Sequence, residues 1–153
     1  MKITAQEEYG LRILIRIASC KSGEGMSIPQ LSETEQLSQH YIAKLTRLLR
    51  MANFIRSTPG NKGGYVLARP ASEIIIKNVL EALGTPLDKE FTDETGAVMR
   101  FCTNSVDCSS RSLWQMIQMT VNNLLERITL QDLVTENANR DTIFDKLSKE
   151  FLV

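Results

Sequence analysis

The chain has 153 residues, of which 42% are hydrophobic and 24% are charged, a composition typical of an ordinary globular protein. Its apolar runs are too short for a membrane span, and charged residues interrupt the first predicted helix, which argues against a signal peptide. We therefore expect a cytoplasmic protein with no membrane partner. Three cysteines, an odd number, argue against a secreted disulfide scaffold.

The formal net charge is zero, but the charges are distributed unevenly along the chain. Residues 1–70 hold ten Lys and Arg against five Asp and Glu, whereas residues 71–153 hold eight against thirteen. The stretch 36–72 contains six basic residues and no acidic one. A protein that binds phosphate groups needs such a local positive surface, so this distribution favours nucleic-acid binding by the first half of the chain.

The first half begins with three predicted helices. The first covers 4–22, where apolar residues recur at helical spacing and Gly23 follows as a stop signal. Ser27 is the expected N-cap of a short helix over 28–35, and Ser38 that of a helix over 39–52. The predicted buried stripe of this third helix is Ile42, Leu45, Leu49 and Ala52, and its opposite face carries Gln39, His40, Lys44, Arg47 and Arg50.

Two helices joined by a short turn, of which the second has a basic outward face, indicate a helix-turn-helix. Two predicted strands, 54–58 and 65–68, follow and flank a turn rich in glycine that contains Asn61, Lys62 and Gly63. A hairpin with a basic tip directly after a recognition helix is a wing. We therefore predict a mainly α fold with a small β-hairpin, in which residues 1–83 form a winged helix-turn-helix domain.

The second half is predicted to contain a loop and a long helix. Residues 84–111 lack periodicity after the short helix that Gly84 ends, and a loop of this length is usually functional. The helix over 112–128 is apolar around most of its circumference, so it needs burial on more than one side. A symmetry-related copy is the simplest second side. We therefore expect a homodimer built on segment 112–135, followed by a helical tail over 136–153.

These features together resemble the Rrf2 family of bacterial winged-helix regulators, which includes regulators of iron–sulfur biogenesis, of the nitric-oxide response and of cysteine metabolism. The resemblance covers about residues 1–135 and depends on the combination of motifs rather than on any single one. The motifs are Met1-Lys2-Ile3-Thr4, Tyr9-Gly10-Leu11-Arg12, Ile28 to Leu31, Leu37 to Ile42 with Leu45 and Leu49, Gly63 to Leu67, Cys108 before Leu113-Trp114, and Ile128 to Leu133.

The resemblance implies a homodimer on a pseudo-palindromic operator in double-stranded DNA, with each recognition helix in a major groove and each wing near a minor groove. Tyr65 has an alternative role as a ring packed under the wing. Ala43 stands where a relative has an acidic residue, so a different base preference is expected. The DNA-binding residues that the resemblance implies are Ser38, Gln39, His40, Tyr41, Lys44 and Arg47 in the helix-turn-helix, and Asn61, Lys62 and Gly63 in the wing.

Cys102 and Cys108 lie in the predicted loop, and thiolates are soft ligands suited to iron–sulfur clusters or zinc. The resemblance implies a 2Fe–2S cluster held by these two cysteines and by Glu8. Two other ligand positions of the family are occupied by Gly96 and Arg111, which cannot ligate. Two alternatives therefore stay open: a thiol or disulfide redox switch without metal, and a cluster-free member that responds to a small ligand.

Other classes of function fit the sequence less well. No nucleophile–base pair, phosphate-binding loop or dinucleotide fingerprint is visible, and the single histidine, His40, is expected to face outward, so we predict no enzyme activity. A winged-helix protein adaptor that does not bind DNA would have a weakly basic recognition face, and this sequence shows the reverse. The sequence predicts a sequence-specific transcription regulator with a redox-sensitive or iron–sulfur-responsive loop.

Overall fold

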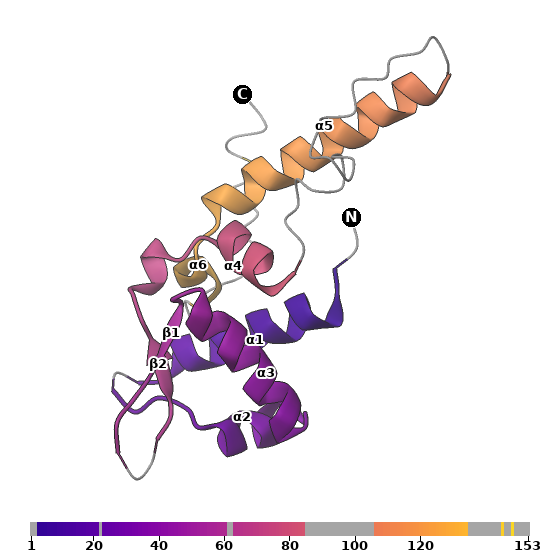
Figure 1. The fold of residues 1–153 in the computed structure, drawn as a ribbon. Coiled ribbons are helices and arrows are strands. Elements are labelled where there is room, and N and C mark those ends of the chain that lie inside the picture. Colours follow the sequence, from indigo (N-terminus) through magenta and orange to yellow (C-terminus); the bar gives the residue numbers. More distant parts are fainter. Residues whose placement is uncertain are drawn as a thin grey trace.

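The computed structural model describes residues 3–21, 23–60, 63–84 and 106–134, together with Asp145 and Ser148; over 106–111 it describes the helical backbone. The described part is mainly helical with one two-stranded sheet (Figure 1), which confirms the predicted fold class. Its elements are α1 (Ala5–Ser19), α2 (Ile28–Glu35), α3 (Gln39–Met51), β1 (Ile55–Ser57), β2 (Tyr65–Leu67), η1 (Ala71–Glu73), α4 (Ile76–Leu83), α5 (Val106–Arg127) and α6 (Leu130–Val134).

Side-chain caps determine where the first helices begin. The backbone N–H of Thr4 donates to the Glu7 carboxylate at 2.7 Å, and the Thr4 hydroxyl accepts from the Glu7 N–H at 3.2 Å. Ser27 and Gln30 form the same reciprocal capping box at the start of α2. The predicted N-cap Ser27 is therefore confirmed. Helix α1 is shorter than the predicted 4–22, because the backbone at Cys20 is already extended.

The helix-turn-helix is formed by α2 and α3, which pack against each other and against α1. Helix α2 ends at Gln36, whose left-handed backbone (φ 56°) reverses the chain within the predicted turn. Ser38 then caps α3 by accepting a hydrogen bond from the Tyr41 N–H. Two such local signals, a left-handed residue and an N-cap, hold the two helices at a fixed angle with only a short connection.

Strands β1 and β2 form the predicted antiparallel hairpin, with Arg56 opposite Val66. A third backbone segment joins its edge, because Met26 and Tyr65 exchange two hydrogen bonds of 3.0 and 2.8 Å. Gly64 is required at this point: a Cβ there would lie 3.0 Å from the Met26 carbonyl carbon. The wing is therefore tied to the segment that leads into α2, and its base is rigid.

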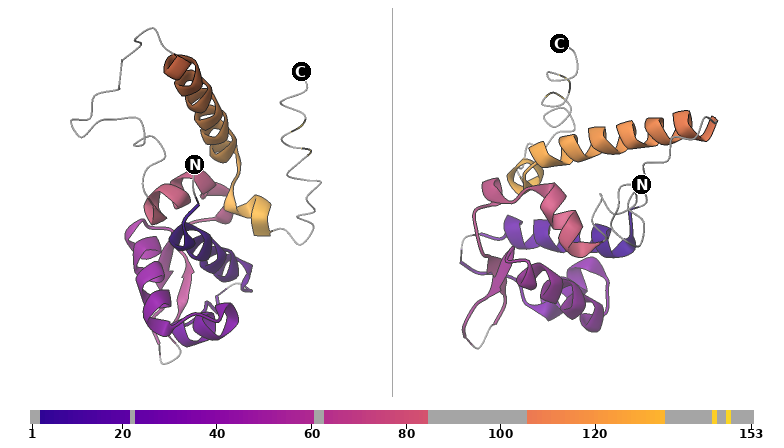
Figure 2. Two further views of the ribbon diagram at one scale, coloured as in Figure 1. Left: turned by 90° about the vertical axis from the view of Figure 1, so that its right-hand side faces the viewer. Right: turned by 45° about the horizontal axis from the view of Figure 1, so that its top comes forward.

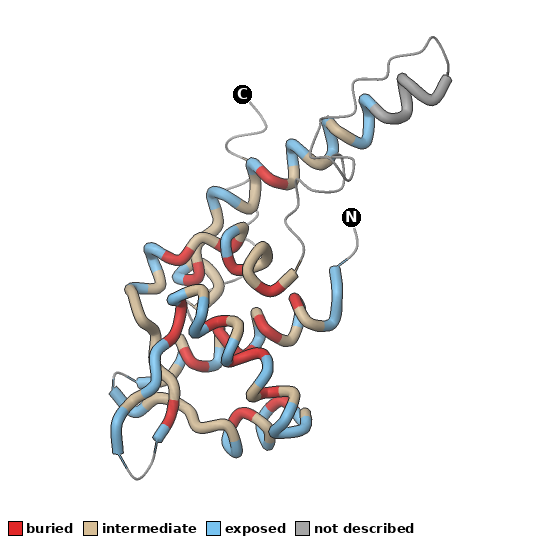
Figure 3. The backbone as a smooth tube through the Cα atoms, viewed as in Figure 1, coloured by how far each residue is buried: buried red, intermediate tan, exposed pale blue. Residues whose placement is uncertain are grey.

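One apolar core lies between α1, α3, α4 and the base of the hairpin (Figure 3). The predicted stripe of α3 is largely confirmed, since Ile42, Leu45 and Leu49 are fully buried and Ala52 is partly buried. Thr46 is also fully buried, which the sequence did not indicate; its hydroxyl donates to the Ile42 carbonyl at 2.9 Å. Among the described residues, the buried hydrophobic side chains of this core are Ile13, Leu14, Ile17, Leu31, Ile42, Leu45, Leu49, Phe54, Ile55, Ile74, Ile76, Val79, Leu83 and Leu130.

Helix α5 begins at Val106, earlier than the predicted Ser112, so the predicted loop over 84–111 is too long at its C-terminal end. Asp107 falls in the first turn, where an acidic residue type favours helix formation. As a result, Cys108 belongs to a helix rather than to a loop. The predicted tail over 136–153 lies outside the described residues, apart from Asp145 and Ser148.

Helix α5 projects away from the winged domain and contacts α4 near its C-terminal end (Figures 1 and 2). The Ile76 N–H donates to the Ile128 carbonyl at 2.9 Å, and the ammonium of Lys77 lies 2.7 Å from the Glu126 carboxylate. Beyond this anchor, its exposed large apolar side chains are Leu113, Trp114, Met116, Ile117 and Met119. No helix in the described ranges combines the length and apolar character needed to cross a bilayer.

Candidate nucleic-acid interface

The outward face of α3 is polar and basic. Helix α3 contains no acidic residue, and its buried side chains all lie on the opposite face. The five side chains predicted to face outward are indeed all exposed: Gln39, His40, Lys44, Arg47 and Arg50. An exposed helix with two positive charges near its middle and donors and acceptors in its first turn is suited to a DNA groove.

The first turn of α3 is held in place from two sides. The Ser38 hydroxyl accepts from the Tyr41 N–H at 3.2 Å, which fixes the backbone of the turn. The Tyr41 ring meets the ring of Tyr9 from α1 edge to face, with centroids 6.3 Å apart and an interplanar angle of 83°. Tyr41 is therefore partly buried, whereas its neighbours Gln39 and His40 are exposed.

The wing is closed by Thr58 and Gly64. The Thr58 N–H donates to the Gly64 carbonyl at 2.8 Å, and the Gly64 N–H donates to the Thr58 hydroxyl at 3.1 Å. Gly63 is exposed at the tip, while Asn61 and Lys62 lie outside the described residues. Tyr65 packs against the core at the wing base, which supports its packing role.

The other arginines of the basic stretch differ in their surroundings. Arg56 is exposed on β1. Arg69 is partly buried instead: its guanidinium lies 5.2 Å from the Phe54 ring centroid, and its Nε donates to the Asn53 carbonyl at 3.3 Å. It thus binds carbonyls just beyond the end of α3, a favourable place for a cation. Part of the positive charge that the sequence shows in 36–72 is therefore structural.

The cluster ligands implied by the resemblance are only partly described. Glu8 is exposed on α1, whereas its neighbour Glu7 is buried and held in the capping box, so Glu8 is the carboxylate of this pair that is open to a metal. Cys108 lies in the first turn of α5, and Cys102 is outside the described residues. Among the described residues no group of three or more His, Cys, Asp or Glu side chains is placed to hold a metal.

The third cysteine, Cys20, is partly buried at the end of α1 and borders a shallow hollow of about 340 Å³ beside the wing strands, together with Lys21 and Arg56. Burial raises the pKa of the Cys20 thiol, and the negative charge of Glu24 raises it further. A thiol with a raised pKa is a weak nucleophile and a poor metal ligand at neutral pH. This environment favours a structural role for Cys20.

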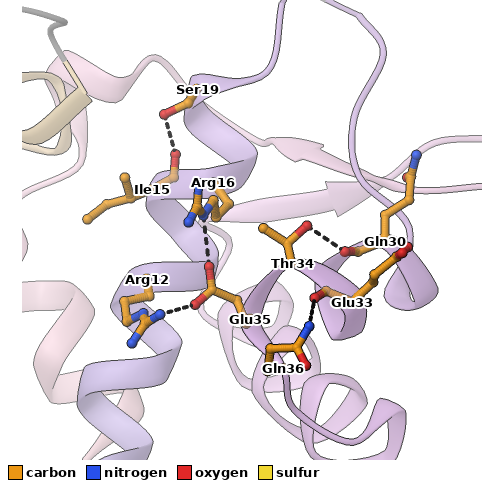
Figure 4. A network of polar contacts seen from close by, with 9 residues as sticks. All are labelled: Arg12, Ile15, Arg16, Ser19, Gln30, Glu33, Thr34, Glu35 and Gln36. Carbon is orange, nitrogen blue, oxygen red and sulfur yellow. Dashed lines mark hydrogen bonds and ion pairs between the residues drawn. The ribbon is translucent and has the colours of Figure 1, made fainter.

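Sequence reasoning missed a buried carboxylate at the end of α2. The side chain of Glu35 is 1% exposed, and both of its oxygens face arginines of α1, at 2.7 Å for Arg12 and 2.8 Å for Arg16 (Figure 4). A signal was present in the sequence, because Arg12 and Arg16 are four residues apart and therefore share one face of α1. It did not identify their partner, which is distant in sequence.

Comparison with known proteins decides the family. The family model Rrf2, described as an iron-dependent transcriptional regulator, matches residues 3–136. The chain belongs to the Rrf2 family. It is 33% identical to protein rrf2 of Nitratidesulfovibrio vulgaris over 136 residues, 89% of either chain. It is also 33% identical to the transcriptional regulator CymR of Bacillus subtilis over 138 residues, 88% of this chain and 91% of CymR.

Solved structures agree with this assignment. The structure of CymR, the global cysteine regulator of B. subtilis, superposes with a TM-score of 0.70 at 32% identity and covers 88% of this chain and 97% of CymR. The structure of T. potens IscR has the same TM-score of 0.70 at 23% identity, covers 92% of this chain and 90% of IscR, and shows the shared fold. This Rrf2 protein is thus a DNA-binding transcription regulator rather than an enzyme, as predicted.

Proposed function

We propose that this Rrf2 protein binds a pseudo-palindromic operator as a homodimer, with α3 of each copy in a major groove and each wing near a minor groove. The observation that carries the proposal is the acid-free, exposed face of α3, presented on a first turn that Ser38 and Tyr9 hold in place. Because this turn is ordered before DNA arrives, little conformational entropy is lost on binding.

Within this interface the residues have two kinds of role. Gln39, His40 and Lys44 are placed to contact base edges, with Ser38 and Tyr41 supporting the turn from which they project. Arg47 is exposed one helical turn further on, where a guanidinium suits a phosphate. For the wing we propose that Asn61, Lys62 and Gly63 meet phosphate or the minor groove.

Selection of bound fragments from bacterial genomic DNA, followed by fluorescence anisotropy on the selected and shuffled sequences, tests the DNA proposal. We expect a strong preference for the selected sequence and a steep fall of affinity with salt, because several phosphates are neutralised in each half-site. Lys44→Ala should change the preferred bases, whereas Lys62→Ala should weaken all sequences alike. Equal affinity for selected and shuffled DNA would refute sequence-specific recognition.

The dimer proposal is supported by the apolar side chains that α5 exposes beyond its anchor, including Trp114 at 59% and Met116 at 64% exposure. Apolar patches of this kind usually mark interaction surfaces. A second copy of α5 is the occupant we propose, because a two-fold dimer also supplies the second recognition helix that a palindromic operator requires. As a protein that acts on the chromosome, the dimer would work in the bacterial cytoplasm.

For the sensing site we propose a 2Fe–2S cluster ligated by Cys102, Cys108 and Glu8. The proposal is supported by the soft donors retained at two family positions and by the exposed carboxylate of Glu8. Such a cluster, when bound, would supply sensitivity to oxidation. Three donors leave one ligand of the usual four to be identified. Glu8 is available as a ligand because Glu7, its neighbour, forms the capping box with Thr4.

Iron content and visible absorption of the anaerobically purified protein test the cluster proposal. We expect bound iron and colour, lost in Cys102→Ala and Glu8→Ala and kept in Cys20→Ala, which is the matched thiol control. An iron-free, colourless protein after reconstitution with iron and sulfide would exclude the cluster. The alternatives would then be a thiol switch or a small-ligand signal, and Cys108→Ser would separate them, since only a thiol switch loses its response to oxidant.

A further inference from the structure

The carboxylate of Glu35 is enclosed between α1 and α2, and the two arginines that face it are not equivalent. Arg12 and Arg16 each keep about half of their side chain exposed, at 48% and 52%, and each approaches one oxygen of Glu35 (Figure 4). A carboxylate so buried requires compensating charge. One arginine alone would neutralise the negative charge of Glu35. The pair therefore provides one positive charge more than this carboxylate requires.

Arg12 makes a second contact that connects it to the recognition helix. Its guanidinium carbon lies 5.5 Å from the centroid of the Tyr9 ring, within the range of a cation–π interaction. The Tyr9 ring in turn meets Tyr41 in an edge-to-face arrangement, a favoured geometry for aromatic pairs. Within the described residues, Arg16 lies over no aromatic ring. A continuous series of contacts therefore runs from Glu35 through Arg12 and Tyr9 to Tyr41.

The series ends at the turn from which the base-contacting side chains project. Tyr41 is the third residue of α3, and its N–H is already bound to the N-cap hydroxyl of Ser38. With its ring held by Tyr9, the turn is fixed both along the helix axis and in rotation about it. A small rotation of α3 would move Gln39 and Lys44 relative to base edges, while leaving the charge of the surface unchanged.

We propose that Arg12 and Tyr9 are positioning residues for DNA recognition: Glu35 fixes Arg12, Arg12 holds the Tyr9 ring, and this ring sets the rotation of α3. The inference rests on the proposed sequence-specific binding and adds two residues of α1 to it. Arg12 and Tyr9 would affect the recognition of bases rather than the attraction of the protein to phosphates. Loss of the series should therefore lower specific affinity and leave non-specific affinity nearly unchanged.

Arg12→Met and Arg16→Met form a matched pair for the test. Each removes one positive charge from α1, and each leaves one arginine on Glu35. We expect Arg12→Met to lower affinity for the selected operator about fivefold to tenfold, as loss of an aromatic-type contact predicts. Arg16→Met should stay within about twofold of wild type. Both should bind shuffled DNA alike and unfold at similar urea concentrations, measured by anisotropy and circular dichroism.

Tyrosine variants provide an independent second test, should Arg12→Met fold poorly. Tyr9→Phe keeps the ring and should bind as wild type, whereas Tyr9→Leu should lose as much specific affinity as Arg12→Met. Because both changes break one series, the double variant should bind no worse than either single one. Additive losses, or equal losses in Arg12→Met and Arg16→Met, would overturn this inference alone. Failure of the wild-type chain to prefer any sequence would overturn the proposed function and this inference together.

Discussion

Ser38 has two roles: its hydroxyl caps α3, and the residue lies on the surface proposed to contact DNA. It accepts a hydrogen bond from the Tyr41 N–H, yet the residue is exposed on the surface proposed to meet phosphates. These two demands favour a small neutral cap, because aspartate would cap equally well but would carry a negative charge. A serine at this position therefore reconciles a capped helix with an anionic partner.

Ser38→Asp should consequently separate folding from binding. We expect its free energy of unfolding in urea to stay close to that of wild type, while operator affinity falls because the new carboxylate faces phosphates. Ser38→Asn, which caps without charge, is the control and should retain both properties better. Ser38→Ala should destabilise the fold by about 1 kcal/mol. Wild-type affinity in Ser38→Asp would place this residue away from the DNA backbone.

Cys20 gives a prediction about pH at the same scale. Since burial, aided by Glu24, raises the thiol pKa in the folded chain, alkylation of Cys20 by iodoacetamide near neutral pH should be slower in the folded chain than in urea. Peptide mass spectrometry would follow this cysteine separately from Cys102 and Cys108. Glu24→Gln should speed the reaction, and equal rates in the folded and unfolded chains would contradict the raised pKa.

The raised pKa of Cys20 also determines how the stability of the fold depends on pH. A thiol whose pKa is raised on folding holds its proton more tightly in the folded state than in the unfolded state. Its stabilising contribution is therefore complete below the ordinary thiol pKa, and it is lost as the pH rises through the raised value. Urea unfolding across the alkaline range should show a larger loss of stability in wild type than in Cys20→Ala.

Among the elements, those with local signals were predictable from sequence. The N-caps Ser27 and Ser38 and the apolar stripe of α3 depend on residues within a few positions of one another, and the structure confirms them. Polar residues that become buried in the folded core were not predictable. Thr46 and Glu35 have residue types typical of surfaces, yet both are buried, and the arginines that face Glu35 lie on α1, about twenty residues away in the sequence.

The same distinction applies to the candidate site. The exposed face of α3 followed from helical periodicity, whereas the contact of Tyr9 with Tyr41 joins residues that are far apart in the chain. Sequence therefore predicted which side chains face outward but not what orients them. The start of α5 was misplaced for a related reason: its first turns lack the apolar periodicity on which the predicted boundary depended.

The wing offers a test at the level of an element. Gly64 and Gly63 are neighbours, but an added Cβ would lie 3.0 Å from the Met26 backbone at Gly64 and 3.5 Å from the nearest atom at Gly63. Gly64→Ala should therefore destabilise the fold by about 1–3 kcal/mol, because the backbone of Met26 cannot move aside cheaply. Gly63→Ala is the control, and urea unfolding should show a much smaller change for it. Equal destabilisation by the two substitutions would mean that the backbone at the wing base can shift to accommodate a Cβ at Gly64.

At the scale of the whole molecule, a contact near the C-terminal end of α5 joins this helix to the winged domain. The bridge between Ile75 and Thr129 and the ion pair of Lys77 with Glu126 fix the C-terminal end of α5 to α4. The rest of the helix extends away from the domain (Figure 2). Dimerisation through α5 would therefore transmit its geometry to each recognition helix in part through this contact with α4.

Ile117→Lys should disrupt the proposed dimer, because it places a charge on the exposed apolar surface of α5. Gln115→Lys is the matched control, since residues two apart lie on nearly opposite faces of a helix. Sedimentation velocity should show monomers for Ile117→Lys and dimers for the control, and operator affinity should fall only in the former. Dimers of both variants would require an interface elsewhere.

The exposed apolar side chains of α5 have a consequence for gene dosage. If two chains must meet before they occupy an operator, the amount of active regulator varies as the square of the amount of free chain. Where dimerisation is weak, a twofold drop in expression would then lower operator-competent dimer by about fourfold. The supply of chains would thus influence operator occupancy independently of any chemical signal.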